Sequence, residues 1–483
     1  MIRFILLLCL SFCSLVHLRA QDPGAVRYSP YEDFDLRSGD FSVVGRVGGR
    51  IYAYQASSDG HFLHAYDDSM AKLATIVLDF FPRRVGSVRF VAYPQKMLLL
   101  YQEVEGRNFT QYAAVLDAEG RLQGEPANIL SARQSGNDPA ITTVVSDDRR
   151  TVACYASDEL DGRDQFTVRW IDDKLNGRGA QRFTLSLNDN LRYGAPALSN
   201  VGTIYLPVIT PVGLKDFADA FYVARMRPDS SGAALEPFRL NGLFSATPFL
   251  KVDNAAGRVY ISGFYSTKKN GHFDGILYGY YDEASATIQS RRTIAFDDRL
   301  REATGDRNRK RAFNAFDVRQ LIVKNDGGFV MVSEENFITT RHGYTPGWGY
   351  YSFYYSPYLS PSVREYHYDD ILALSYDADG NREWHAFVRK SQYSQEDGGI
   401  FSSYALVNTG SSLGFLFNDF NRARSNIQLA IMDDQGGVST QAFASATPGT
   451  PDWLPRSAKQ ISAHELVVPC LRRRQLCFAR VVL

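Results

Sequence analysis

The chain repeats an apolar run that ends in aspartate, and this repeat limits what it can fold into. Four of the seven runs continue as Asp-x-x-Gly, in which the carboxylate caps a tight turn and glycine takes the left-handed backbone conformation. The intervals between the seven aspartates are 50, 55, 57, 53, 95 and 56 residues. The runs end at Asp67, Asp117, Asp172, Asp229, Asp282, Asp377 and Asp433. Each run therefore predicts a strand that leads into a turn.

Within each interval, shorter apolar runs alternate with Asp, Gly and Asn, as in "FSVVGRV", "RIYAYQA" and "FLHAYDD". Runs at such short and regular spacing are typical of an all-β chain. A four-stranded unit that repeats near every fifty residues is the signature of a β-propeller, a ring of sheets called blades. We expect eight blades, with seven as the alternative, because one weak repeat could be a long excursion.

The two ends of the chain predict how the ring closes. After Asp433 only three strands remain, the last being "QLCFARVVL". The segment "AVRYSPYEDFDL", residues 25–36, is expected to supply the missing fourth strand and so to remove an exposed sheet edge. Residues 21–483 then form one domain. Its blades are expected at 41–80, 86–131, 139–187, 195–240, 246–296, 315–391, 402–445, and 455–483 with 25–36.

The N-terminus, "MIRFILLLCLSFCSLVHLRAQDPG", has the form of a signal peptide. Arg3 precedes an apolar stretch, and Ala20 offers a small residue before a cut at Gln21. The apolar stretch is too short to span a bilayer. We therefore expect residues 1–20 to be a leader and the protein to be exported and soluble, in the periplasm or outside the cell.

Charge and motifs narrow the classes of partner. Lys plus Arg and Asp plus Glu number 53 each, which gives no general attraction to nucleic acid or anionic membrane. The chain has no HExxH, CxxC or phosphate-loop motif. We expect no cofactor, no metal and a monomeric protein.

One unit shows a resemblance to a known family. "ALSYDADGNREW", Ala373–Trp384, resembles the turn of quinoprotein-type propeller repeats, a relative of the WD40 type, in which the tryptophan docks between blades. Residues 326–420, with "YHYDDILALSYDADGNREW", are similar to exported bacterial propeller proteins that have no assigned activity. The resemblance implies the architecture and no quinone cofactor.

The long interval before Asp377 points to a decorated face. In a propeller blade, the loops between the second and third strands and those between blades emerge on one side. Segments 297–312, 340–369 and 390–399 are all of these two kinds, and they surround the sixth blade. We expect the aromatic stretch among them to present a binding surface, or alternatively to form a lid that plugs the ring. The candidate binding residues are Tyr344, Trp348, Tyr350, Tyr351, Tyr354, Tyr355, Tyr358, Lys390 and Gln392.

Carboxylates gather at the base of the same segments. Glu334 and Glu335 are expected to end one strand and Asp369 and Asp370 to begin the next, with Asp397 on the following connection. Such acids could catalyse glycoside cleavage or hold calcium, or they could be salt bridges and caps that anchor a loop. The sequence favours an exported binding or scaffold protein for a glycan or another exported protein. The alternative is a carbohydrate-active enzyme, a glycoside hydrolase or lyase.

Cys470 and Cys477 flank "LRRRQL" near the C-terminus. A four-residue loop would place them opposite each other as a non-hydrogen-bonded pair, with a spacing that suits a disulfide. Two separate buried thiols are the other outcome.

Overall fold

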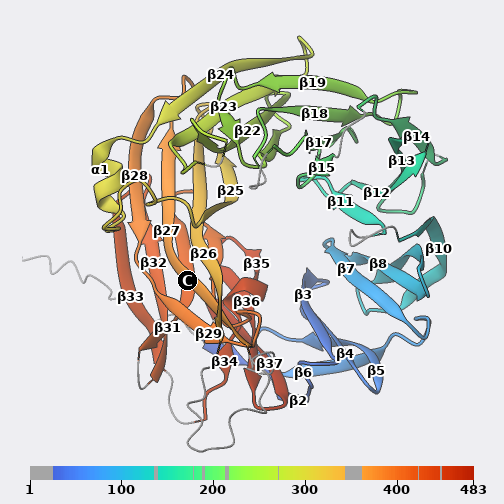
Figure 1. Cartoon of the computed structure of the whole chain (residues 1–483). Coiled ribbons are helices and arrows are strands. Elements are labelled where there is room, and N and C mark those ends of the chain that lie inside the picture. The colour runs from blue at the N-terminus through green and yellow to red at the C-terminus, as the bar shows by residue number, and fades with distance from the viewer. Residues whose placement is uncertain are drawn as a thin grey trace, which may run out of the picture.

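The structure, a computed structural model, describes residues 26–134, 140–160, 162–177, 179–187, 191–212, 217–269, 271–342, 362–421, 424–445 and 449–483. The predicted leader, residues 1–20, lies outside these ranges. The strands form eight antiparallel sheets around a central opening, which confirms the eight-bladed propeller (Figure 1). The described part of the chain contains no helix long and apolar enough to cross a membrane.

The first four blades follow the chain order from the inner strand to the outer one. Blade 1 contains β3 (Asp40–Val47), β4 (Arg50–Ser57), β5 (Gly60–Tyr66) and β6 (Lys72–Val77). Blade 2 contains β7 (Val85–Ala92), β8 (Lys96–Glu105), β9 (Asn108–Asp117) and β10 (Leu122–Arg133). Blade 3 contains β11 (Thr142–Val145), β12 (Thr151–Leu160), β13 (Arg163–Asp172) and β14 (Gln181–Thr184). Blade 4 contains β15 (Arg192–Tyr193), β16 (Ala197–Leu198), β17 (Ile204–Ile209), β18 (Ala220–Met226) and β19 (Ala234–Arg239).

The last four blades include the decorated sixth blade and the composite eighth. Blade 5 contains β20 (Phe244–Ser245), β21 (Phe249–Asp253), β22 (Arg258–Ser266), β23 (Gly275–Asp282) and β24 (Thr287–Ala295), and α1 (Asp298–Ala303) follows it. Blade 6 contains β25 (Phe316–Val323), β26 (Phe329–His342), β27 (Ser362–Tyr376), β28 (Arg382–Val388) and β29 (Gln392–Gln395). Blade 7 contains β30 (Tyr404–Asn408), β31 (Leu413–Asn421), β32 (Arg424–Met432) and β33 (Val438–Ser445). Blade 8 contains β34 (Asp452–Trp453), β35 (Lys459–Ser462), β36 (Glu465–Arg472), β37 (Gln475–Val482), β1 (Val26–Tyr28) and β2 (Glu32–Asp33), with the 3-10 turn η3 (Pro455–Ser457).

The N-terminal segment completes the last blade, as the sequence predicts. β1 pairs with β37 so that Val26 lies opposite Val481, and β2 pairs further along the same strand. Phe34 follows and is buried in a cluster with Ile51 of blade 1 and Phe478 of blade 8. The ring is therefore closed both by backbone pairing and by apolar packing.

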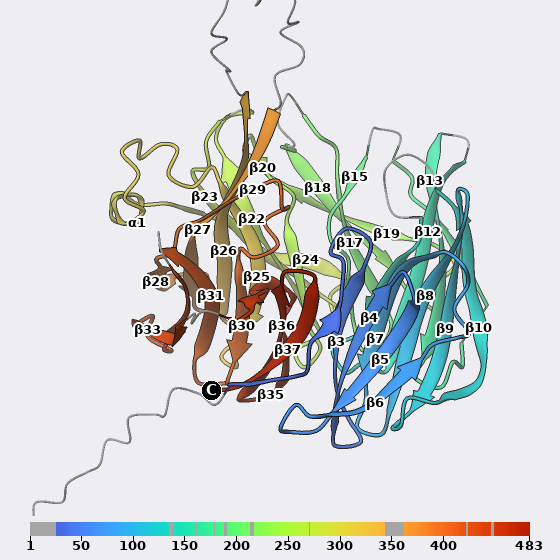
Figure 2. The same cartoon turned by 90° about the horizontal axis from the view of Figure 1, so that it is seen from below.

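The core is divided among the spaces between blades. Each of eight buried apolar clusters joins two consecutive blades, and together they run once around the ring. The view turned by 90° shows the sheets next to one another around the axis of the ring (Figure 2). Because apolar burial is the main driving force for folding, no blade is expected to be stable without its neighbours.

Six of the seven repeated aspartates accept backbone N–H groups in their turns, as predicted. Oδ1 of Asp117 accepts the backbone N–H groups of Glu119 and Arg121 at 3.0 and 2.8 Å, and Gly120 has a φ of 81°. Asp377 and Asp433 make the same turn. The carboxylate of Asp229 binds the guanidinium of Arg227, at 2.9 and 2.8 Å.

The structure shows two buried thiols at Cys470 and Cys477 and no disulfide. Cys470 and Cys477 do face each other on β36 and β37, but both are free, buried thiols. Pairing continues to Arg472 opposite Gln475, so the turn has two residues rather than four. Hydrogen-bonded and non-hydrogen-bonded pairs alternate along the two strands, so the shorter turn makes the cysteines a hydrogen-bonded pair. The Cα atoms of such a pair lie farther apart than those of a non-hydrogen-bonded pair.

Candidate functional site

The sixth blade carries a longer hairpin than the sequence predicted. The segment 340–369 was expected to be a loop, but β26 continues to His342 and β27 begins at Ser362. The pairing runs unbroken from Asn336 opposite Tyr368 up to His342. The two strands rise beyond the ring in the side view (Figure 2). Glu334, Glu335, Asp369 and Asp370 therefore lie within paired strands, not at strand ends.

The three expected segments do lie together, although not all are loops. Within 390–399, β29 pairs with β27 and adds a third strand to the hairpin. The 297–312 segment contains α1. At its C-terminal end, the carbonyls of Ala303 and of the capping residue Thr304 accept hydrogen bonds from the Arg389 guanidinium. Arg389 also pairs with Asp370. The seven predicted aromatic contacts, Tyr344, Trp348, Tyr350, Tyr351, Tyr354, Tyr355 and Tyr358, lie outside the described residues.

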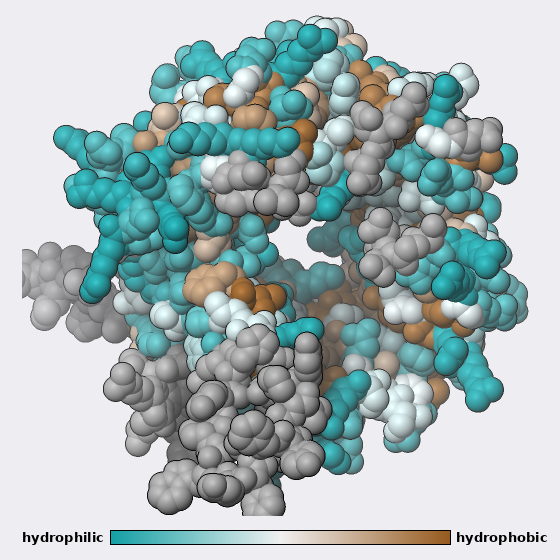
Figure 3. All heavy atoms as spheres, in the orientation of Figure 1, coloured by the Kyte–Doolittle hydropathy of each residue, from teal (hydrophilic) through white to brown (hydrophobic). Residues whose placement is uncertain are grey.

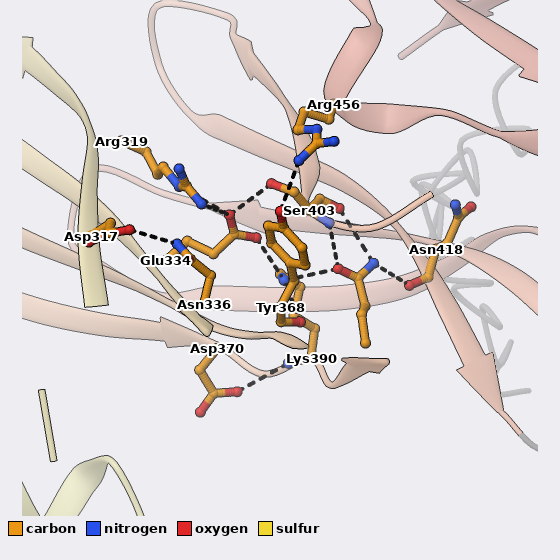
Figure 4. Close-up of polar contacts among 11 residues, drawn as sticks. Asp317, Arg319, Glu334, Asn336, Tyr368, Asp370, Lys390, Ser403, Asn418 and Arg456 are labelled. Carbon is orange, nitrogen blue, oxygen red and sulfur yellow. Dashed lines mark hydrogen bonds and ion pairs between the residues drawn. The ribbon is translucent and has the colours of Figure 1, made fainter. Parts of the chain in front are cut away.

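Glu334 is the centre of a buried ionic network at the foot of the hairpin (Figure 4). Its Oε1 lies 2.9 Å from Nζ of Lys390, and its Oε2 lies 3.2 Å from Arg319 and accepts the Ser403 hydroxyl at 2.8 Å. Burial lowers the pKa of Lys390, and the carboxylate of Glu334 opposes this shift. Arg319 comes from the inner strand of blade 6 and Ser403 from the start of blade 7, so the network ties the hairpin to the ring.

Gln392 extends this network toward the last two blades. Its Oε1 accepts the ammonium of Lys390 at 3.1 Å and the backbone N–H of Ser403 at 2.7 Å. Its Nε2 donates to the carbonyl of Asn418 at 2.7 Å, and the Asn418 amide donates to the carbonyl of Trp453 in blade 8. Lys390 and Gln392 were both predicted as binding residues. Both are buried, and they connect the hairpin to the neighbouring blades.

The remaining acids divide into a cluster and a cap. Glu335 stands opposite a bulge in which Asp369 and Asp370 occupy the place of one residue. Burial, and then the nearby charges of Asp369 and Asp370, raise the pKa of Glu335 to about 7. Asp397 lies apart and caps its own turn, since Oδ1 accepts Ser394 at 2.6 Å and the Gly399 N–H at 2.8 Å. Over the described ranges, no three His, Cys, Asp or Glu side chains are arranged to hold a metal ion.

The upper part of the hairpin presents one exposed face, which we call the platform. Its first row is aromatic: the Phe337 ring stacks on His367 with centroids 4.5 Å apart, and His367 meets Tyr393 at 5.1 Å. The exposed fractions of Phe337 and Tyr393 are 36% and 46%, so both rings keep surface toward solvent. Its second row is polar and consists of Thr339, Glu365 and Gln395.

Hydrogen bonds join the two rows of the platform. Tyr393 donates its hydroxyl to Oε1 of Glu365 at 2.8 Å, and Thr339 donates to Oε2 of the same carboxylate at 3.1 Å. Gln395 donates to Glu365 at 3.3 Å. Because residues two apart on a strand share a face, the pairing itself places these side chains on one surface.

Sequence reasoning missed the platform, although a signal was present. "FITTRH" after Glu335 and "SVREYHY" before Asp369 are rich in β-branched and aromatic residues, which favour strands. Because prolines and glycines lie between these two stretches, the whole interval was predicted to be one loop. β-propensity at the two ends of the interval would have predicted the extension.

The comparisons with known proteins concern the fold. Neither a protein-family model nor a curated protein matches the chain. Similar solved structures include a prolyl endopeptidase, with 10% identity, a TM-score of 0.44, and coverage of 90% of this chain and 55% of that one. Prolyl oligopeptidase B from Galerina marginata has 10% identity and a TM-score of 0.42 over the same shares. Synechocystis apocarotenoid oxygenase has 12% identity and a TM-score of 0.35 over 72% of this chain and 73% of its own.

The chain thus spans 55% of the length of the prolyl peptidases it matches. At these identities and TM-scores the likenesses carry no conclusion about the function of this chain. The resemblance of Ala373–Trp384 to quinoprotein-type repeats stays an expectation, although Trp384 does dock between blades and donates its indole N–H to the Asp434 carbonyl at 2.9 Å.

Proposed function

We propose that the chain is an exported binding protein that recognises a glycan through the platform on the blade 6 hairpin. The observation that supports this function is the pair of exposed rings Phe337 and Tyr393, joined by the half-buried ring of His367, beside a row of hydrogen-bonding groups. Aromatic faces offer rigid apolar contact to the C–H surface of a sugar ring. Carboxylate, amide and hydroxyl groups beside them can bond the sugar hydroxyls.

The position of the platform supports the same function. The buried network of Glu334 and Lys390 holds the foot of the hairpin, so the rings are displayed on a braced support. Arg456 of blade 8 adds a further brace by donating to the Tyr368 hydroxyl at 2.9 Å. A preorganised surface loses less entropy when a ligand binds. Another exported protein is the second kind of partner that such a surface would suit.

A glycan array probed with the purified chain tests the proposal, followed by calorimetry on the bound glycan. Tyr393→Ala is expected to weaken binding by about thirtyfold, the loss typical of a central aromatic contact. Tyr393→Phe keeps the ring and is expected to lose much less. Leu160→Ala, a change at an exposed apolar residue of blade 3, is the matched control and should bind as the parent does. Equal binding by Tyr393→Ala and the parent would exclude the platform, and capture of a protein without any glycan would favour the second kind of partner.

A hydrolase at the foot of the hairpin is the alternative function, and one observation favours it. A pKa of about 7 would let Glu335 act as a general acid, while Asp369 beside it could act as base or nucleophile. Glu334 and Asp397 are not candidates for catalysis, because Glu334 is held in an ion pair and Asp397 caps a turn. Glycan cleavage that Glu335→Gln abolishes, with folding intact, would support the enzyme. Binding without products would support the binding protein.

A further inference from the structure

Three cations converge on the wall of the central opening, far along the sequence from one another. Arg89 lies on β7, Arg149 in the turn between β11 and β12, and Lys459 on β35. They belong to blades 2, 3 and 8, whose inner strands border the opening (Figure 1). The space-filling view shows that the opening passes through the molecule (Figure 3). Together the three residues line a recess of about 270 Å³ with segments 90–92 and 145–147.

The carboxylates of the described residues do not neutralise the positive charge of this recess. Among the described residues, no carboxylate lies within ion-pair distance of any of the three cations. Within the described part of the chain, the side chain of each cation instead donates one hydrogen bond to a backbone carbonyl. These bonds are Arg89 Nη1 to Thr143 at 2.8 Å, Arg149 Nη1 to Ala92 at 3.0 Å, and Lys459 Nζ to Val44 at 2.9 Å.

Asp147 is the acidic residue of the lining, and another cation already engages it. Its two oxygens lie 3.0 and 2.9 Å from Nζ of Lys251. The recess therefore keeps a net positive charge. Burial, and then the charges of Arg149 and Arg89, lower the pKa of Lys459 to about 8, as expected for a cation that lacks an anionic partner. Protein walls around such a recess also concentrate its field.

We propose that this recess binds a small oxyanion, a phosphate or sulfate group that is either free or part of a larger molecule entering the opening. Guanidinium groups present forked N–H donors that match the oxygens of such ions, and the ammonium adds donors with rotational freedom. Each cation has more donors than its one carbonyl bond uses. The volume is below that of pockets for drug-sized ligands, which suits a single charged group. This site is independent of the platform.

Calorimetric titration of the full chain with inorganic phosphate, in a low-salt buffer, tests the site. Lys459→Gln and Arg89→Gln are each expected to weaken phosphate binding by roughly tenfold or more, because each removes a charge-assisted hydrogen bond. Lys459→Arg keeps the charge and should bind within a few-fold of the parent. Arg121→Gln makes the same change of charge at an exposed turn of blade 2 and should have no effect.

Urea unfolding of each variant shows whether a loss of binding reflects a loss of folding, and Lys459→Arg provides a second test if Lys459→Gln unfolds. Titration with glycerol phosphate distinguishes the two sources: tighter binding than phosphate indicates a larger ligand, and equal binding indicates the ion alone. The proposal is overturned if the parent does not bind phosphate, or if folded Lys459→Gln and Arg89→Gln bind it as the parent does.

Discussion

Nζ of Lys390 lies 2.9 Å from Oε1 of Glu334, and the exposed fractions of the two side chains are 1% and 0%. Arg319 and Ser403 bond the other carboxylate oxygen, so donors from three places surround one buried charge. A buried charge is tolerated only when it is paired and hydrogen-bonded. This arrangement explains why the acid has a structural position at the foot of the hairpin.

Lys390→Met is expected to lower the free energy of unfolding by about 3–5 kcal/mol, because it leaves the carboxylate of Glu334 short of a partner in the interior. Urea denaturation followed by tryptophan fluorescence measures the change. Arg121→Met, which removes an exposed cation, is the control and should cost less than about 1 kcal/mol. Similar costs for both variants would show that Lys390 does not stabilise the network.

The raised pKa of Glu335 predicts that the stability of the protein depends on pH. Its folded-state pKa, about 7, lies above its ordinary value of 4.5 because of burial and the neighbouring Asp369 and Asp370. Between these values the folded protein keeps a proton that the unfolded chain has lost. Stability should therefore fall as pH rises from 4.5 to 7 and change no further above 7 on account of this group.

Glu335→Gln should remove this dependence and raise stability at pH 8 by at most about 3 kcal/mol. Urea midpoints at pH 5 and pH 8 measure the effect. Glu125→Gln, at an exposed position on β10, should leave the difference between the two pH values as in the parent. A parent-like difference in Glu335→Gln would mean that another group titrates in this range.

The fold could be predicted because its main determinants are local and repeated. Asp117, Asp377 and Asp433 cap their turns through contacts with residues two to four positions away, so sequence spacing alone carries the information. Ring closure was predictable because the last unit lacks a strand. The two-residue turn between Cys470 and Cys477 was not, since a shift in turn length changes the pair type without changing the apolar pattern.

The site was less predictable, because it depends on side-chain direction and on contacts between blades. Glu334 and Glu335 are adjacent in one motif, yet the first is fully buried in an ion pair and the second faces two aspartates across a bulge. Nothing in the local sequence distinguishes the two. Arg89, Arg149 and Lys459 come together only after three blades have taken their places in the ring.

Gly436 and Gly410 offer a matched test of how Trp384 docks between blades. Both glycines have left-handed backbones, with φ of 79° and 90°, but a Cβ at Gly436 would lie 2.7 Å from the Trp384 ring, whereas one at Gly410 would meet nothing within 4 Å. Gly410→Ala should cost about 1 kcal/mol for its backbone conformation. Gly436→Ala should cost about 1–3 kcal/mol more, since the ring must also move. Thermal and urea unfolding measure both, and equal costs would show that the ring adapts freely.

The last prediction concerns the closure of the ring. It compares two residues of one short segment that differ in burial. Phe34 is 4% exposed and packs between blades 8 and 1, while Leu36 is 41% exposed. Phe34→Ala should lower the free energy of unfolding by about 3–5 kcal/mol and increase cleavage of the N-terminal segment in limited proteolysis. Leu36→Ala should change stability by less than about 0.5 kcal/mol. If both variants unfold at the same urea concentration as the parent, the packing of Phe34 adds nothing to closure, and the pairing of β1 and β2 with β37 is the contribution of this segment that remains.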